Sequence, residues 1–324
     1  MYFTKLKEKI RNRNSVLCLG LDTDMGKLPS SLCEEISQDV AARYIKQPSF
    51  SLGFQQGPIP QIFSSKEWSN GMAMLEFNCR IIDATIDSVA VYKCNAGFYL
   101  AQGATGLLAL QATVRYSHEL GGLAILDLKG NDIGNSAAQY AKFAFEVIGA
   151  DAATVNPYLG HLDAADAFTA YKDRGVYILC LTSNKGANEF QSNQLANDGR
   201  LLYGKVYDSV ETKWNGHGNC GLVIGATRAE IMPSLRQQRG PGMPWLVPGF
   251  GKQEGDVENS VKFACSSGDN AVFNLSRELL YGKNDTDRSE LIGDAYFARV
   301  AFDTEAWRQQ INQFRPSIAA EVAS

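Results

Sequence analysis

The sequence predicts a (β/α)8 barrel, and three observations support this fold class. Eight short apolar runs recur along the 324 residues, each run ends in a polar or charged residue, and helix-like stretches separate the runs. The runs are continuously apolar, which is typical of parallel strands buried on both faces. Eight such strands alternating with helices predict a closed barrel, which we expect to be a single catalytic domain over residues 1–324. A doubly wound sheet is the alternative, but it usually has fewer strands and a glycine-rich first turn.

The strands are predicted in order from these runs. They cover Val16–Asp22, Val89–Asn95, Gly122–Lys129, Asp151–Pro157, Gly175–Thr182, Cys220–Thr227, Pro244–Gly251 and Asn270–Arg277. Two of the stretches between them illustrate the helical pattern. Residues 135–149 repeat alanine and phenylalanine at helical spacing and end at a glycine, and residues 67–88 form a second helical stretch.

Two connections are longer than a barrel needs, so we expect insertions after strands 1 and 5. The first, between Asp22 and Val89, has room for an extra helix over about residues 31–46 and a Pro/Gly/Ser/Gln-rich segment over 47–61. The second covers residues 183–219 and is rich in Asn, Gly and Gln. Both leave strand ends, where barrel active sites are assembled, and are therefore candidate lids.

Composition narrows the function classes. Apolar residues at 45% and charged residues at 20% are typical of a globular protein. The net charge of -4 argues against a general nucleic-acid binder but is compatible with a local pocket for a small anion. Seven scattered cysteines without a C-x-x-C pair suggest neither a disulfide framework nor a zinc ribbon. Without a signal-peptide pattern or a long apolar stretch, we expect a cytoplasmic protein with no membrane association.

Polar residues at the predicted strand ends are the candidates for chemistry. The carboxyl ends of barrel strands converge on one mouth, where this chain presents Asp22, Lys93, Asn95, Asp127, Lys129, Asn156, Thr182 and Arg277. A single charged residue there would be read as a solvated rim residue. That interpretation does not suit a group of alternating charges such as Lys93, Asp127 and Lys129, followed by Asp132 in the next turn. Buried charges are costly unless they pair, so this group favours a functional site.

A second candidate feature lies at strands 7 and 8. Glycines 249, 251 and 255 follow the seventh strand, and the eighth ends at Ser276 and Arg277, where a helix is predicted. Barrels commonly bind phosphate between these two loops, with backbone N–H groups facing the anion. Arg277 would add a bidentate donor.

Other motifs are weaker. Residues 199–206 imitate a P-loop, but Val206 replaces the required hydroxyl residue and no strand precedes them. The three histidines are far apart and form no metal-binding element, whereas a carboxylate-only magnesium site stays open.

The string Asp127-Leu-Lys129-Gly-Asn-Asp132-Ile-Gly-Asn, with Gly20-Leu-Asp22 and Lys93, resembles orotidine 5'-monophosphate decarboxylase. The match extends to Thr182-Ser-Asn, to Pro248-Gly-Phe-Gly-x-Gln253 and to Asn274-x-Ser-Arg277, and so covers all eight strands. It is most similar to the longer, type 2 branch found in many bacteria and in apicomplexan parasites. Ser276 stands where that family often has glycine, and Lys185 stands where proline is common.

The resemblance implies a cofactor-independent lyase that converts orotidine 5'-phosphate to uridine 5'-phosphate and CO2, the last step of de novo UMP biosynthesis. Asp127 would face the substrate carboxylate, and Lys129 would protonate C6, with Lys93 as the second candidate donor. Asp132 and Ile133 would reach into the neighbouring subunit's site, so the resemblance implies a homodimer. The same resemblance assigns substrate binding to Asp22 at the ribose, Asn95, Ile133, Ser136, Thr182, Ser183, Pro248, and the phosphate-binding Gln253, Ser276 and Arg277.

Two rival functions remain at this point. One is a metal-assisted phosphosugar barrel with the same D-x-K element, such as a 3-keto-gulonate-6-phosphate decarboxylase or a hexulose-phosphate synthase, which are usually much shorter. The other is a non-catalytic nucleotide-binding barrel in which the lysines are structural. Metal dependence separates the first from the decarboxylase, and ligand binding without turnover separates the second.

Overall fold

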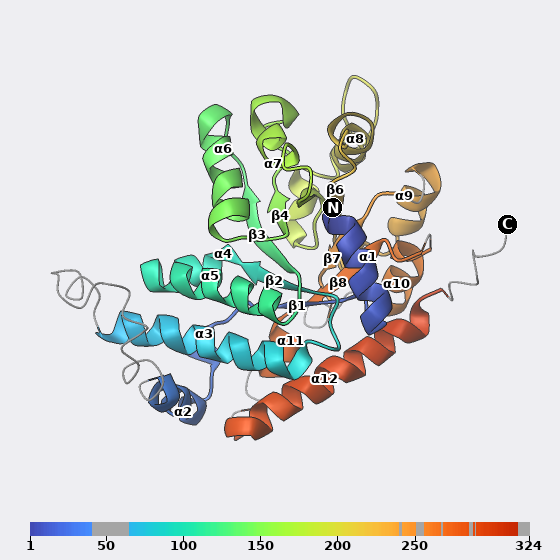
Figure 1. The fold of residues 1–324 in the computed structure, drawn as a ribbon. Coiled ribbons are helices and arrows are strands. Elements are labelled where there is room, and N and C mark those ends of the chain that lie inside the picture. The colour runs from blue at the N-terminus through green and yellow to red at the C-terminus, as the bar shows by residue number, and fades with distance from the viewer. Residues whose placement is uncertain are drawn as a thin grey trace.

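The computed structural model describes residues 1–40, 65–239, 242–250, 256–266, 268–284, 288 and 290–316, and it confirms the (β/α)8 barrel. Eight parallel strands close in sequence order, with β8 paired to β1 (Figure 1). The strands are β1 Leu17–Gly20, β2 Val91–Asn95, β3 Ala124–Gly130, β4 Ala152–Val155, β5 Gly175–Leu181, β6 Cys220–Ile224, β7 Trp245–Pro248 and β8 Ala271–Leu275. Seven of the eight predicted runs contain one of these strands, and β3 extends one residue beyond its run.

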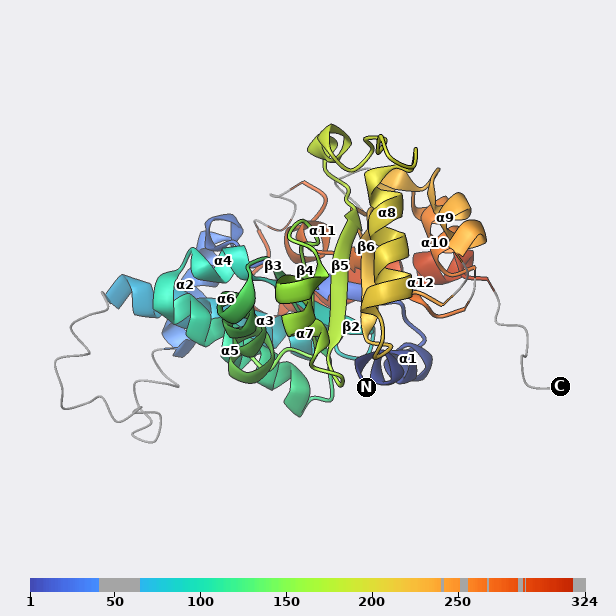
Figure 2. The same cartoon turned by 90° about the horizontal axis from the view of Figure 1, so that it is seen from above.

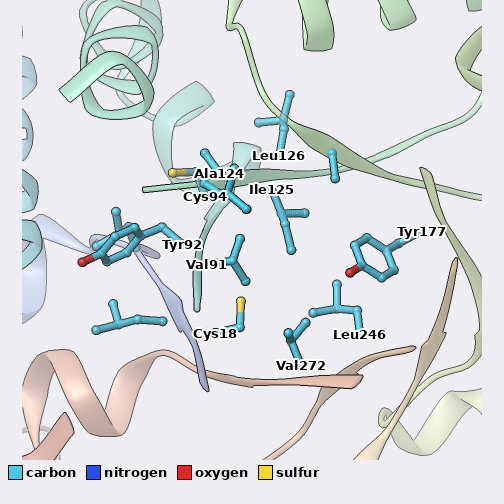
Figure 3. Packing of buried hydrophobic residues seen from close by; sticks show 14 of the residues in the cluster. Cys18, Val91, Tyr92, Cys94, Ala124, Ile125, Leu126, Tyr177, Leu246 and Val272 are labelled. Carbon is cyan, nitrogen blue, oxygen red and sulfur yellow. The ribbon is translucent and has the colours of Figure 1, made fainter. Parts of the chain in front are cut away.

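The barrel interior explains why the strands are apolar throughout. Nearly every strand residue is buried, because one face points to the barrel axis and the other packs under the surrounding helices. Figure 3 shows buried side chains from different strands converging in the interior, among them Cys18, Val91, Ile125, Tyr177, Leu246 and Val272. Side chains alternate along a strand, so Lys93 and Asp127, two residues beyond Val91 and Ile125, face the same interior nearer the mouth.

The helices surround the strands (Figure 1). They are α1 Tyr2–Arg13, α2 Ser30–Val40, α3 Ser65–Thr85, α4 Ala96–Leu100, α5 Gly103–Glu119, α6 Gly134–Lys142, α7 Asp166–Thr169, α8 Leu202–Ser209, α9 Met232–Arg239, α10 Val257–Ala264, α11 Arg277–Tyr281 and α12 Gly293–Phe314. Short 3-10 or π turns lie at Met25–Lys27, Phe143–Val147, His161–Ala165, Lys185–Glu189, Val210–Trp214 and Ala226–Arg228.

Most predicted helices are present with shifted bounds. The helix predicted over 135–149 is α6, which continues as a π turn before Gly149 takes a φ of 80° and ends it. The helix predicted over 67–88 is α3. The extra helix predicted over about 31–46 begins as α2 at Ser30, while residues 41–46 and the segment 47–61 lie outside the described residues.

Two helices, α1 and α12, were not predicted from the sequence. Figure 2 shows α1 at the end of the barrel where the strands begin, opposite the segment that follows β5. Tyr2 of α1 is buried, and its ring packs edge-on against Tyr177 of β5 with centroids 6.0 Å apart. Gly175 has no room for a Cβ because this ring lies against it. The second element, α12, packs along α3 and α10.

The connection after β5 is long and contains its own structure. It includes the turn Lys185–Glu189, an isolated bridge between Gln194 and Leu201, helix α8 and the π turn Val210–Trp214. Part of the predicted insertion is therefore the ordinary helix that follows a barrel strand. None of the helices in the described ranges is long and apolar enough to span a lipid bilayer.

Candidate active site

A buried ion pair between neighbouring strands forms the centre of the candidate site. Lys93 on β2 and Asp127 on β3 face the barrel interior near the mouth, and the Lys93 Nζ lies 2.9 Å from Asp127 Oδ2. The side chains are only 5% and 11% exposed. Asp22, just after β1, places its Oδ1 3.8 Å from the same Nζ. Lys93 is thus held between carboxylates from the strands on either side of β2.

Lys129 extends this arrangement toward solvent. Its Nζ lies 2.7 Å from Asp127 Oδ1, and its side chain is 49% exposed. Asp127 therefore bridges two lysines, one buried and one open to the mouth. Lys93, Asp127 and Lys129 thus lie in contact in the order that the sequence predicts, although the strand geometry at Lys129 is irregular.

The local backbone at Lys129 departs from an ideal strand. The pairing of β3 with β4 shifts register between Leu126 and Gly130, and Lys129 itself has a φ of 51°. Its N–H donates to Thr154 Oγ1 at 2.9 Å, and the Thr154 hydroxyl donates to Asp127 Oδ1 at 2.9 Å. Thr154 on β4 thus holds both Lys129 and Asp127 in place. A positive φ at a non-glycine residue is rare and costs energy, which is typical of functional sites.

The electrostatics keep the network charged. Burial alone would lower the pKa of Lys93, but the carboxylates of Asp127 and Asp22 outweigh it and raise the pKa above its usual range. Burial alone would raise the pKa of Asp127, but the ammonium groups of Lys93 and Lys129 hold that pKa well below its usual range. A salt-bridged Lys–Asp pair with shifts in these directions stays ionised throughout the neutral pH range.

Asp132 lies apart from this network within one chain. It is half-buried, and its Oδ1 accepts a hydrogen bond of 2.8 Å from the Ile133 N–H. Among the described residues it forms no ion pair with Lys93 or Lys129. Ile133 is 59% exposed, and Ser136 in the first turn of α6 is also exposed. Ile133 and Ser136 are therefore open to solvent, and Asp132 is partly so.

Two predicted substrate residues already have local hydrogen-bond partners. Asn95, at the end of β2, caps α4 by accepting a bond of 3.1 Å from the Gly97 N–H. Thr182, after β5, is held by Gln191, whose Oε1 accepts from the Thr182 N–H at 2.8 Å and whose Nε2 donates to the Thr182 hydroxyl at 2.8 Å. Sequence reasoning missed Gln191, because a neutral residue inside a long connection carries no pattern.

Ser183 and Pro248 lie at neighbouring parts of the mouth. The Ser183 carbonyl accepts a bond of 3.1 Å from the Thr227 hydroxyl after β6. A Cβ on Gly225 would come within 2.6 Å of the Ser183 backbone nitrogen, so only glycine permits this close approach. Pro248 ends β7, where its backbone pairs with Asn274 of β8.

The predicted phosphate-binding residues are only partly described. Gly249 has a φ of 105°, consistent with a glycine turn after β7, whereas Gln253 lies outside the described residues. Ser276 precedes α11, and Arg277 at its first position is exposed. Serine at 276 is accommodated because Gly20 opposite has no side chain, and the Ser276 hydroxyl accepts a bond of 3.2 Å from Asn274 Nδ2.

The mouth thus has two polar regions, both predicted from the sequence. One is the row of ion-paired side chains at the ends of β1–β3, and the other is Arg277 with the glycine turn after β7. In the described part of the chain, no group of three or more His, Cys, Asp or Glu side chains is placed to hold a metal ion.

Comparisons with known proteins agree with this arrangement. The family model described as orotidine 5'-phosphate decarboxylase / HUMPS family matches residues 15–290. The orotidine 5'-phosphate decarboxylase of Haloarcula marismortui is 36% identical over 317 residues, which cover 97% of this chain and 99% of that protein. The protein of the same name from Cellvibrio japonicus is 38% identical over 320 residues, with coverage of 97% and 99%. The structure of Leishmania donovani OMP decarboxylase superposes with a TM-score of 0.69 at 29% identity, covering 97% of this chain and 98% of that one.

Proposed function

This chain belongs to the orotidine 5'-phosphate decarboxylase family, and from that premise we propose how its residues convert orotidine 5'-phosphate to uridine 5'-phosphate and CO2. The observation that carries the proposal is the chain Lys93–Asp127–Lys129 at the barrel mouth, with contacts of 2.9 and 2.7 Å. Nothing in barrel packing requires two lysines and an aspartate in this position. The proposed reaction uses no cofactor.

The chemistry explains the residue types. When the bond between C6 and the carboxylate breaks, CO2 leaves and the electron pair stays on C6 as a vinyl carbanion with little resonance stabilisation. The protein must then supply fixed positive charge close to C6. Lys129 meets this requirement, because Asp127 and Thr154 orient it and its side chain reaches the open mouth. Its ammonium group gives a proton to C6 and regains one from solvent.

Asp127 has two roles in the proposed mechanism. Its Oδ1 orients Lys129, and its charge faces the departing carboxylate, which raises the energy of the bound substrate relative to the transition state. Lys93 keeps Asp127 ionised from the buried side. Lys93 is the second candidate for the proton donor, but its 5% exposure and its two carboxylate neighbours suit it better to holding the network.

The remaining site residues divide along the substrate. We assign Asp22 to the ribose hydroxyls, and Asp22 Oδ1 is buried without a hydrogen-bond partner in the described structure. Asn95 would border the ribose and the reacting centre, Thr182 and Ser183 the pyrimidine edge, and Pro248 the base. Ser276 and Arg277, with Gln253, would bind the phosphate, whose binding energy can be expressed in the transition state.

We also propose a homodimer in which Asp132 and Ile133 complete the second subunit's site, with Ser136 alongside. Asp132 lacks a cationic partner among the described residues of its own chain. Large apolar side chains are exposed on the two connections that follow β3 and β4: Ile133 is 59%, Tyr158 79% and Leu162 81% exposed. Large exposed apolar side chains on neighbouring connections are typical of protein–protein interfaces. A carboxylate delivered across such an interface would extend the charge alternation to four residues.

The activity is tested with purified protein pretreated with EDTA. We expect loss of the ultraviolet absorbance of orotidine 5'-phosphate with equimolar release of CO2 and no requirement for added metal. Activity that appears only on addition of a divalent cation would favour the metal-assisted phosphosugar rival. Binding of uridine 5'-phosphate without any turnover would favour the non-catalytic barrel.

The phosphate assignment is tested by Arg277→Ala. We expect the affinity for uridine 5'-phosphate to fall by roughly 10- to 100-fold, because charge-assisted bonds to the phosphate are lost, while the affinity for uridine stays the same. Both dissociation constants can be measured by calorimetry. Arg11→Ala is a matched control, because Arg11 is exposed on α1 at the opposite end of the barrel. Equal losses for the nucleotide and the nucleoside would refute the assignment.

A further inference from the structure

The loop that carries Asp22 is held by two buried tyrosine hydroxyl groups. After β1, the Leu21 carbonyl accepts a hydrogen bond of 2.9 Å from the Tyr99 hydroxyl of α4. The next carbonyl, that of Asp22, accepts one of 3.2 Å from the Tyr281 hydroxyl of α11. The Tyr281 oxygen also accepts a bond of 2.6 Å from the Asp24 N–H. Two consecutive carbonyls, one of them belonging to Asp22, are therefore fixed from opposite sides.

A buried asparagine reinforces this arrangement. Asn78 of α3 donates to the Tyr99 hydroxyl at 3.0 Å, and its Oδ1 accepts from the Thr23 hydroxyl at 2.5 Å. The second Nδ2 bond, of 3.1 Å, goes to Thr113 of α5. Asn78, Tyr99 and Tyr281 are each at most 1% exposed. Among the described residues, this cluster forms hydrogen bonds to each of Leu21, Asp22, Thr23 and Asp24, the four residues that follow β1.

We propose that Tyr281 and Tyr99 are positioning residues for Asp22, and thereby set how tightly the enzyme recognises the ribose hydroxyls of its nucleotide. The proposal rests on the ribose role assigned to Asp22 above. The carboxylate of Asp22 has one buried oxygen without a hydrogen-bond partner, so its placement depends on its backbone and on Lys93 at 3.8 Å. The Leu21 N–H already pairs with the Lys93 carbonyl at 2.8 Å, which leaves the carbonyl side of the loop to the tyrosines.

Tyr281 also connects the two protein segments that are assigned to opposite ends of the substrate. It is the last residue of α11, the same short helix that begins with Arg277. One hydroxyl therefore connects the helix assigned to the phosphate with the loop assigned to the ribose. A shift of α11 relative to β1 would move Asp22 and Arg277 apart, and the bonds of Tyr281 oppose that shift.

The test compares Tyr281→Phe with Tyr296→Phe. Tyr296 is a matched control, because its buried hydroxyl also donates to a carbonyl of α11, that of Leu280, at 2.6 Å, but has no hydrogen bond to residues 21–24 in the described structure. The measurements are the dissociation constants of uridine 5'-phosphate and of 2',3'-dideoxyuridine 5'-phosphate, together with the melting temperature and with turnover of orotidine 5'-phosphate.

We expect both variants to melt at a lower temperature than the wild type. Of these two variants, only Tyr281→Phe should bind uridine 5'-phosphate with a smaller advantage over the 2',3'-dideoxy analogue. We expect the ratio of the two dissociation constants to change by about tenfold, because one well-placed hydrogen bond is worth about that factor. Tyr99→Phe should act in the same direction. An unchanged preference in Tyr281→Phe, or an equal loss in Tyr296→Phe, would overturn the inference even if the wild type is active. A wild type without turnover in which Tyr281→Phe still loses the ribose preference would support the inference and reject the proposed activity.

Discussion

Replacing Lys129 with alanine should reduce kcat for orotidine 5'-phosphate by at least about 10⁴-fold. The variant loses the proposed proton donor and the positive charge next to C6 together, and both contributions are large in water-excluded sites. The fold should be preserved, because Asp127 keeps its bonds to Lys93 and Thr154. Affinity for uridine 5'-phosphate should change by less than about tenfold, since the product already carries its proton at C6.

The experiment needs steady-state turnover and product binding on the same preparation. Lys142→Ala is a suitable control, because Lys142 is an exposed lysine at the end of α6. A Lys129→Ala variant that keeps the wild-type rate would reject the assignment and move the role to Lys93. A variant that loses product affinity and turnover in equal proportion would identify Lys129 as a binding residue.

The barrel and the centre of the charged network could be predicted from the sequence because both leave strong patterns. A strand buried on both faces must be continuously apolar, so Lys93 and Asp127 stand out within their runs. Their pairing then follows from the register of the adjacent parallel strands β2 and β3. Asn95 lies opposite Asp127, so Lys93, two residues before Asn95 on the same face, lies one step deeper in the barrel. The apolar runs and the charge alternation together therefore predict the ion pair between Lys93 and Asp127.

Neutral positioning residues could not be predicted in the same way. Thr154 and Gln191 orient Lys129 and Thr182, but a threonine in an Ala/Val strand and a glutamine in a long connection are ordinary there. No feature of the sequence indicated the left-handed backbone at Lys129, because the alternation of side chains along a regular strand already places Lys129 on the same face as Asp127. Tyr281 lies 257 positions from Asp24, and only the closure of the barrel brings them together.

Asp132 is the residue of the proposed site that the described part of one chain does not bring into the charged network. The sequence motif places it three residues after Lys129, yet among the described residues its carboxylate accepts a hydrogen bond only from the neighbouring Ile133 N–H. The proposed site therefore needs Asp132 from a second copy. Asp132→Ala should then remove most activity from its partner's site while leaving its own Lys93–Asp127–Lys129 chain in place.

Mixing two inactive variants tests this sharing. A Lys129→Ala chain retains Asp132, and an Asp132→Ala chain retains Lys129, so a mixed dimer contains one complete site and one that lacks both groups. Random exchange of equal amounts makes about half of the dimers mixed, which restores about a quarter of all sites. Each variant alone should be inactive, and a mixture of Lys129→Ala with itself after the same exchange procedure is the control.

The central claim is that four alternating charges from two chains form one decarboxylation site. Its most direct test is the specific activity of this mixture toward orotidine 5'-phosphate, with the fraction of mixed dimers measured by differential tagging. We expect about a quarter of the wild-type activity when half of the dimers are mixed, and we expect the activity to change in proportion to that fraction. Confirmed mixed dimers without activity, or an Asp132→Ala variant as active as the wild type, would contradict it.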